Sequence, residues 1–176
     1  MNLIPFQTRF AELGKSPQGA LHMLFEALVT LQDDIALAEQ QAALVFNGQQ
    51  LYRQADAPSG WDVGNSVRFL LQQLKAKPHI VASYLGGTPQ QHYRDADLIQ
   101  LPLNYPAENS LIGGIRVKQS AMVEGANEGQ LTILSSGKDL PTVIYLAKNA
   151  RGLWKIDTRS LSNIATGVKA PTPEDF

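Results

Sequence analysis

The sequence contains no cysteine, which excludes disulfide bonds and metal sites built on thiolates. It also has no excess of positive charge, because 15 basic residues stand against 16 acidic ones and give a net charge of −1. A nucleic-acid partner is not expected, since such proteins usually carry a basic balance or patch. No apolar run approaches the ~20 residues that span a bilayer, and the N-terminus lacks a basic region followed by an apolar run. We expect a soluble, cytoplasmic protein without membrane contact, unless a signal peptide preceded this sequence.

The length favours a single domain over residues 1–176, because about 100–150 residues is the commonest domain size. A hydrophobic content of 44% is ordinary for a globular protein with its own core. The order of the patterns divides this domain into a helical half at about 5–95 and a β half at about 97–158. A short segment and a tail follow at 159–176.

The clearest helix begins at Ser16-Pro17, with the serine as N-cap and the proline at the first helical position. The apolar side chains that follow recur on one helical face, at Leu21, Leu24, Phe25, Leu28 and Leu31. His22 lies off this stripe, which predicts a solvated imidazole.

Further helices are predicted on both sides of this one. A short amphipathic helix over 5–13 ends at Gly14, and Asp33-Asp34 begins a helix that ends before Asn47-Gly48. Asp62 is predicted to cap the next helix, which Pro78 closes. A last short helix over 78–85 ends at Gly86-Gly87.

After Tyr93 the apolar period changes from helical to strand-like. Strands are predicted at 99–105 and 111–123, the second with a bulge at Gly113-Gly114, and a meander follows over Leu131–Ile156. The meander turns at 136–139 and 149–152. Helices first and strands second predict an α+β fold, with N-terminal helices packed on one face of a four- to five-stranded antiparallel meander sheet. A short helical segment is expected around Leu161 to Val168.

Several short motifs occur in order along the chain: the segment Tyr84–Pro89 with its Gly-x-Thr-Pro end, the Ser-Ser-Gly turn at 135–137, Trp154 in the last predicted strand, and the exit at 168–171. Together they resemble the motifs of an uncharacterised bacterial family of domains of unknown function. The resemblance covers about 16–171, and it implies a helical half before a sheet but no established activity. The chain departs from the family pattern at Lys138-Asp139, where an Ala-Asp-Ser run is usual, and it lacks an arginine next to Pro141.

Two of these motifs could bind an anion. Gly86-Gly87-Thr88-Pro89 could present backbone N–H groups at a helix start, although a C-cap followed by an N-cap is the favoured interpretation. The segment 135–138 resembles the end of a phosphate-binding loop, but it lacks the upstream glycine, and Asp139 replaces the serine or threonine. A hairpin turn is favoured there.

Other side chains could contact a ligand. Arg116 and Lys118 alternate outward on one strand and are interpreted first as a solvated face, then as a surface for an anionic or protein partner. Tyr145 and Trp154 are more often sheet core than a ligand platform. The candidate ligand-binding residues are Tyr84, Gly86, Gly87, Thr88, Tyr93, Arg116, Lys118 and Trp154.

No catalytic constellation is recognisable, and no metal site is expected. His92, Asp95 and Asp97 are the metal-ligand candidates, but their spacing defines no known site. We favour a non-catalytic binding or protein-interaction module over an enzyme, and expect no cofactor. The alternative is a small-molecule-binding or enzymatic cleft between helices and sheet, lined by Tyr84, Tyr93 and Trp154. A structural domain of a larger assembly is the third hypothesis. The partner and the oligomeric state stay open.

Overall fold

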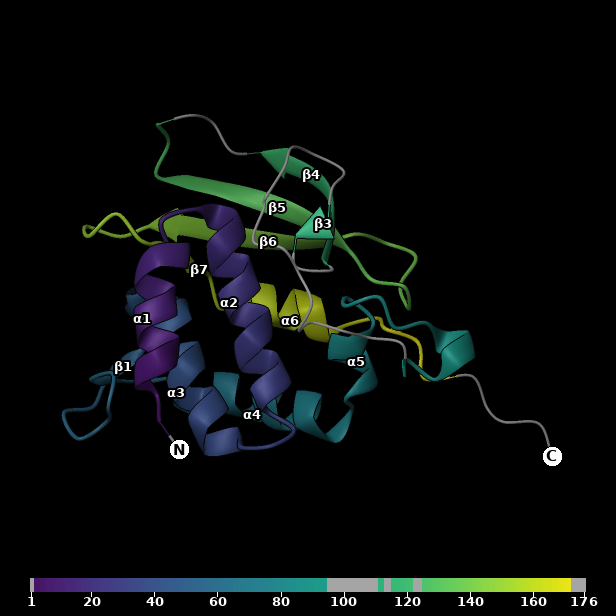
Figure 1. Cartoon of the computed structure of the whole chain (residues 1–176), viewed down its shortest axis with the longest axis horizontal. Coiled ribbons are helices and arrows are strands. Elements are labelled where there is room, and N and C mark those ends of the chain that lie inside the picture. Colours follow the sequence, from purple (N-terminus) through teal and green to yellow (C-terminus); the bar gives the residue numbers. More distant parts are fainter. Residues whose placement is uncertain (1, 95–110, 113–114, 122–124, 172–176) are drawn as a thin grey trace.

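The structure is a computed structural model that describes residues 2–94, 111–112, 115–121 and 125–171. It confirms the α+β class, with helices in the first half and antiparallel strands in the second. Figure 1 shows a sheet along one side of the molecule and helices α1 to α4 on the other, with α6 packed beneath the sheet. No helix in the described ranges is long and apolar enough to cross a membrane.

The helices of the described chain are α1 (Ile4–Leu13), α2 (Pro17–Thr30), α3 (Ile35–Val45), α4 (Gly64–Ala76), α5 (His79–Ala82) and α6 (Arg159–Ala165), with short 3-10 turns η1 (Gly48–Gln50) and η2 (Pro89–Gln91). The strands are β1 (Tyr52–Arg53), β2 (Trp61–Asp62), β3 (Leu111–Ile112), β4 (Ile115–Ala121), β5 (Glu128–Leu134), β6 (Thr142–Lys148) and β7 (Trp154–Ile156). The predicted strand at 99–105 lies outside the described residues.

Two of the predicted helix caps are confirmed and one is wrong. Ser16 accepts a hydrogen bond from the backbone N–H of Gly19 at 3.0 Å, and Asp34 accepts one from Leu37 at 3.1 Å. Asp62 caps no helix, because it lies in β2, which pairs with β1. Its carboxylate instead accepts a hydrogen bond from Arg68 Nη2 at 2.6 Å. The β1–β2 hairpin was not predicted, because two-residue strands leave no periodic signal.

The prediction that His22 is solvated is wrong, since only 4% of the residue is exposed. Its Nε2 lies 3.3 Å from Glu26 Oε1, and Arg9 on α1 donates a hydrogen bond to the same carboxylate oxygen. Burial would raise the pKa of Glu26, but the hydrogen bonds from His22 and Arg9 outweigh it and hold that pKa below its ordinary value. Helix α1 therefore covers a second face of α2 that the apolar stripe alone does not indicate.

The larger sheet has the strand order β3-β4-β5-β6-β7, and every neighbouring pair is antiparallel. The predicted strand over 111–123 is two strands, because β3 turns back and pairs with β4. The irregularity in register lies between Val117 and Gln119, while the glycines at 113–114 lie outside the described residues. Both predicted turns, at 136–139 and 149–152, separate consecutive strands as expected.

One hydrophobic core joins the two halves of the chain. Alternate residues of β5, β6 and β7 are buried in it, in keeping with the two-residue period of a strand. These are Leu131, Ile133, Ile144, Leu146, Trp154 and Ile156, which meet fully buried residues of α2 such as Leu21, Leu24 and Phe25.

We predict that Gly64→Ala destabilises the protein by about 1–2 kcal/mol, because Gly64 has a φ of +77° and L-residues avoid that region. A Cβ at this position would also lie 2.3 Å from Cε2 of the Tyr52 ring. Gly48→Ala is the matched control, since its added Cβ meets nothing within 4 Å. The midpoints of urea unfolding of the two variants should separate clearly, and equal midpoints would contradict the prediction.

Candidate functional site

The family-like motifs meet in space and form a hydrogen-bonded joint, which we call the serine junction: Ser83, Gly87, Ser135 and Ser136. Ser135 Oγ donates to Ser83 Oγ at 2.6 Å and accepts from the backbone N–H of Gly137 at 3.1 Å. The backbone N–H of Ser136 donates to the carbonyl of Ser83 at 2.9 Å, and Ser136 Oγ donates to the carbonyl of Gly87. The turn after β5 is thereby fixed to the end of α5.

Close backbone packing at Tyr93 completes this joint and explains two of the glycines. A Cβ on Gly87 would lie 2.8 Å from the carbonyl oxygen of Tyr93, and one on Gly137 would lie 2.4 Å from the Tyr93 hydroxyl oxygen. That hydroxyl donates to the carbonyl of Lys169 at 2.7 Å, and the Lys169 N–H donates to the carbonyl of Gly137 at 2.8 Å. The chain itself therefore fills the space that a phosphate bound at these glycines would need.

Two further ligand candidates lie in the core. Tyr84 is 1% exposed, and its hydroxyl lies 2.8 Å from Thr142 Oγ1 and 3.0 Å from the carbonyl oxygen of Ile164. Burial raises the pKa of Tyr84 to about 12, although the hydrogen bond with Thr142 acts against the rise. Trp154 is also buried, with Lys148 Nζ 5.3 Å from its ring centroid.

The remaining candidates are placed only in part. Gly86 has a φ of +97°, as expected after a short helix, and Thr88 precedes η2 and is half-buried. Arg116 and Lys118 lie in β4, but the structure does not describe their side chains. Asp95 and Asp97 are also outside it. His92 adopts a φ of +54°, and its Nδ1 lies 3.3 Å from Arg94 Nη2.

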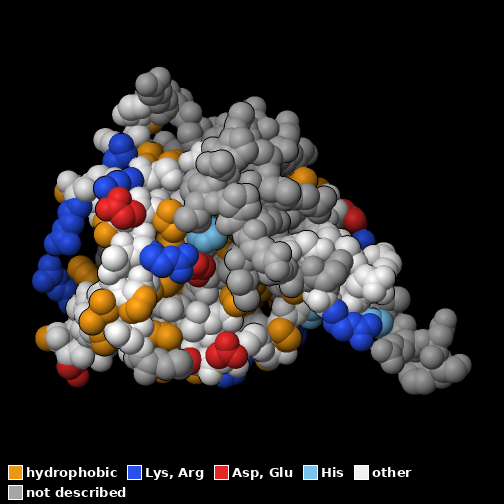
Figure 2. Space-filling view, viewed as in Figure 1, with side chains coloured by type: hydrophobic (Ala, Val, Ile, Leu, Met, Phe, Trp, Pro, Cys, Tyr) orange, Lys and Arg blue, Asp and Glu red, His pale blue; other side chains and the backbone are white. Residues whose placement is uncertain are grey.

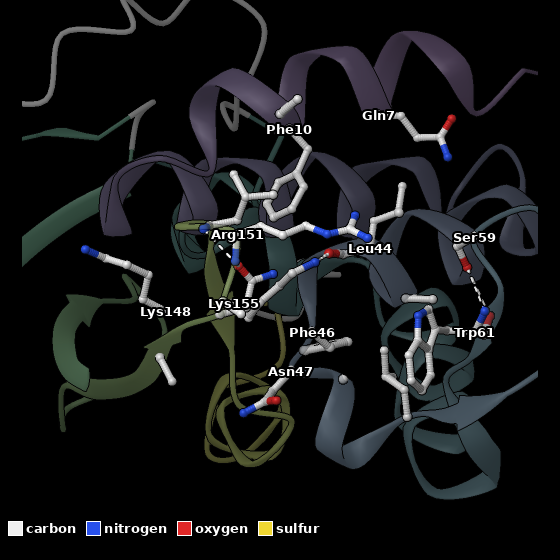
Figure 3. A pocket seen from close by; sticks show the side chains of 18 of the residues that line it. Gln7, Phe10, Leu44, Phe46, Asn47, Ser59, Trp61, Lys148, Arg151 and Lys155 are labelled. Carbon is white, nitrogen blue, oxygen red and sulfur yellow. Dashed lines mark hydrogen bonds between the residues drawn. The ribbon is translucent and has the colours of Figure 1, made fainter. Parts of the chain in front are cut away.

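A cleft of about 900 Å³ lies at a different place, where α1, α3 and η1 meet the ends of the strands. It is not lined by Tyr84, Tyr93 or Trp154. Its walls come from both halves of the chain, so no local motif indicates it (Figure 3). Residues that line the cleft include Phe10, Leu44, Phe46, Asn47, Trp61, Lys148, Arg151 and Lys155.

Lys155 is the most unusual group in this cleft. Its ammonium donates a hydrogen bond to the carbonyl of Leu44 and lies 4.7 Å from the centroid of the Phe10 ring. Burial, together with the charge of Arg151, lowers the pKa of Lys155 to about 8. The alternation of β7 produces this position, since the flanking Trp154 and Ile156 point into the core and Lys155 points the other way. That alternation is the one sequence signal that could have found it.

The cleft has a cationic end and an aromatic end. Arg151 extends from the turn between β6 and β7 into the cleft near Lys155, whereas Trp61 lies at the far side from Lys148 (Figure 3). Ser59 fixes the Trp61 backbone, since its Oγ donates to the Trp61 carbonyl at 3.1 Å and accepts from the Trp61 N–H at 3.3 Å. Figure 2 shows Lys and Arg side chains gathered along the edge of the molecule where Figure 1 places this turn.

The fold and the cleft define an α+β domain with a ligand-sized, cation-containing cleft between its helices and its sheet. The chain belongs to the family described as "Domain of unknown function (DUF6935)", whose model matches residues 2–172. No curated protein and no solved structure matches the chain. The resemblance noted from the motifs is therefore confirmed at the level of an uncharacterised family.

We predict that Ser135→Ala destabilises the protein by about 1–3 kcal/mol, because the buried N–H of Gly137 and the hydroxyl of Ser83 lose a partner. Ser66→Ala, at an exposed position of α4, is the control and should stay within about 0.5 kcal/mol. Chemical denaturation measures both changes, and equal stability of the two variants would refute a structural role for the junction.

We predict that Lys155→Met stabilises the protein at pH 7 by about 1–3 kcal/mol, because the native state disfavours the charged amine. Between the native pKa of about 8 and the ordinary value of 10.5, the unfolded chain binds more protons than the native protein. Wild-type stability should consequently rise across that window, and this contribution should be absent from Lys155→Met. Unfolding at pH 7, 8.5 and 10 tests the sign; an equal slope in both proteins would disprove the burial of this charge.

Proposed function

We propose that this protein is a non-catalytic binding module whose cleft between α1, α3 and the ends of β5, β6 and β7 holds a small-molecule ligand. The volume and the lining of this cleft are the observations that support the proposal. Its volume of about 900 Å³ lies in the range of small-molecule sites, which measure roughly 300–1,000 Å³. Its walls also combine apolar and aromatic surface with a few polar groups, as such sites do.

The arrangement of the polar groups favours binding over catalysis. The hydroxyls of the serine junction hydrogen-bond within the fold, and the tyrosine hydroxyls of Tyr84 and Tyr93 bond to backbone carbonyls. The cationic groups in the cleft are hydrogen-bond donors, which orient a ligand without requiring proton transfer. In this proposal the chain acts as one domain, because the cleft walls and the core are shared by both halves.

Gly48 offers a way to block the cleft. It lines the cleft, and a Cβ added there meets nothing within 4 Å, so a larger side chain enters open space without disturbing the core. We predict that Gly48→Leu weakens the binding of a small-molecule ligand by about ten-fold or more, which corresponds to about 1.4 kcal/mol. Gly48→Ala is the matched control and should retain binding.

Protein-detected NMR with a collection of small metabolites provides the test. Ligands should shift the backbone amide signals of Asn47, Trp61 and Arg151, and Gly48→Leu should abolish those shifts. Ligands that map to another surface, or that bind Gly48→Leu as well as the wild type, would refute the proposal. A collection that yields no ligand at millimolar concentration would do the same.

A further inference from the structure

We infer that the ligand of this cleft is an organic anion, whose carboxylate or phosphate group lies between the guanidinium of Arg151 and the ammonium of Lys155. This inference rests on the proposed function and adds the chemical class of the ligand. Nothing in the family description assigns such a site.

The charges in the cleft are unbalanced. The charged residues that line it are Glu128, Lys148, Arg151 and Lys155, whereas α1, α3 and η1 contribute uncharged side chains to its walls. Among the described residues, no ion pair includes any of these four residues. Because Arg151 and the partly buried Lys155 repel each other, an anion between them would relieve the repulsion and gain charge-assisted hydrogen bonds from both.

The two cations are positioned for one shared anion. The ammonium of Lys155 is held by the Leu44 carbonyl and the Phe10 ring, so it is already fixed before a ligand arrives. Arg151 lies in the exposed turn before β7 and reaches into the cleft beside Lys155 (Figure 3). A guanidinium binds a carboxylate or a phosphate through two parallel N–H donors, which suits this open position. Lys148 is a natural comparison, because its ammonium lies over Trp154 and points away from the cleft centre (Figure 3).

The remaining walls fit an apolar or planar portion of the same ligand. Phe46 and Leu51 are buried cleft residues, and the half-buried ring of Trp61 faces the cleft from its other side. Arg53 lies 5.1 Å from the Trp61 ring centroid and covers one face of that ring. A molecule with a ring at one end and an oxyanion at the other would use both ends of the cleft.

Anion binding should be coupled to protonation of Lys155. A negative charge beside this amine favours its charged form and raises its pKa from about 8. At pH 7 the free protein already carries most of that proton, whereas at pH 8.5 it carries a minority. Binding at pH 8.5 should therefore take up a fraction of a proton, and binding at pH 7 should take up much less.

Calorimetric titration of the full chain with 1-naphthoate, 1-naphthyl phosphate, inorganic phosphate and the uncharged 1-naphthamide tests the inference. The naphthoate or the naphthyl phosphate should bind about ten-fold or more tightly than the amide. Arg151→Gln and Lys155→Met should each weaken that binding about ten-fold, and Lys148→Gln should change it less than about three-fold. A preference for one of the two naphthyl anions assigns the ligand to carboxylates or to phosphates, while inorganic phosphate measures the oxyanion alone.

Proton uptake provides a second readout. Titrations with 1-naphthoate at pH 8.5, in buffers of different ionisation enthalpy, should report uptake in the wild type and none in Lys155→Met. The inference would be overturned if the amide and the anions bound equally well, or if neither Arg151→Gln nor Lys155→Met weakened anion binding. Either result would leave the proposed function intact. If metabolites bind in the cleft but none of the four probes binds, the inference is likewise overturned and the proposed function stands. If Gly48→Leu has no effect on any ligand, the proposed function itself fails.

Discussion

The short strand β7 is the constraint on which the two halves of the molecule depend. Its outer edge is hydrogen-bonded to the helical half at both ends: the Trp154 N–H donates to the carbonyl of Gly14 at 2.7 Å, and the Ile156 carbonyl accepts from the Asn47 N–H at 2.8 Å. These two bonds satisfy backbone groups on the outer edge of β7, which an unpaired edge strand would leave without partners. The sheet can thus bury Trp154 and Ile156 against α2 and α3.

The same attachment creates the cleft. Because β7 alternates, fixing Trp154 and Ile156 inward forces Lys155 onto the opposite side, next to the end of α3. The ammonium is then partly removed from water, and its hydrogen bond to Leu44 compensates only in part, which explains its lowered pKa. A positive charge held in this way is costly for stability, and side chains with strongly shifted pKa values cluster at functional sites.

The serine junction fixes the opposite end of the sheet and accounts for the motifs that the family resemblance highlighted. Ser83, Ser135 and Ser136 bond to one another or to backbone, and Gly87 and Gly137 are small because Tyr93 packs against them. Motifs that look distinctive in a sequence can therefore have a structural role, here the close packing of the turn after β5 against the end of α5. Here they lie away from the cleft, whose lining residues belong to no recognisable pattern.

The sequence by itself determined the α+β class, the helix caps at Ser16 and Asp34, and the turns of the meander. These features depend on neighbours a few residues apart, so periodicity and capping chemistry encode them directly. Only the tertiary structure decided the burial of His22, the use of Asp62 as a partner of Arg68, and the meeting of Arg151, Lys155 and Trp61 around one cleft. The burial of His22 and the assembly of the cleft depend on contacts between residues far apart in the chain, and Lys155 reaches the cleft only because β7 closes its edge on the helices. Asp62 and Arg68 are only six residues apart, but their pairing depends on the two-residue strands β1 and β2, which leave no periodic signal.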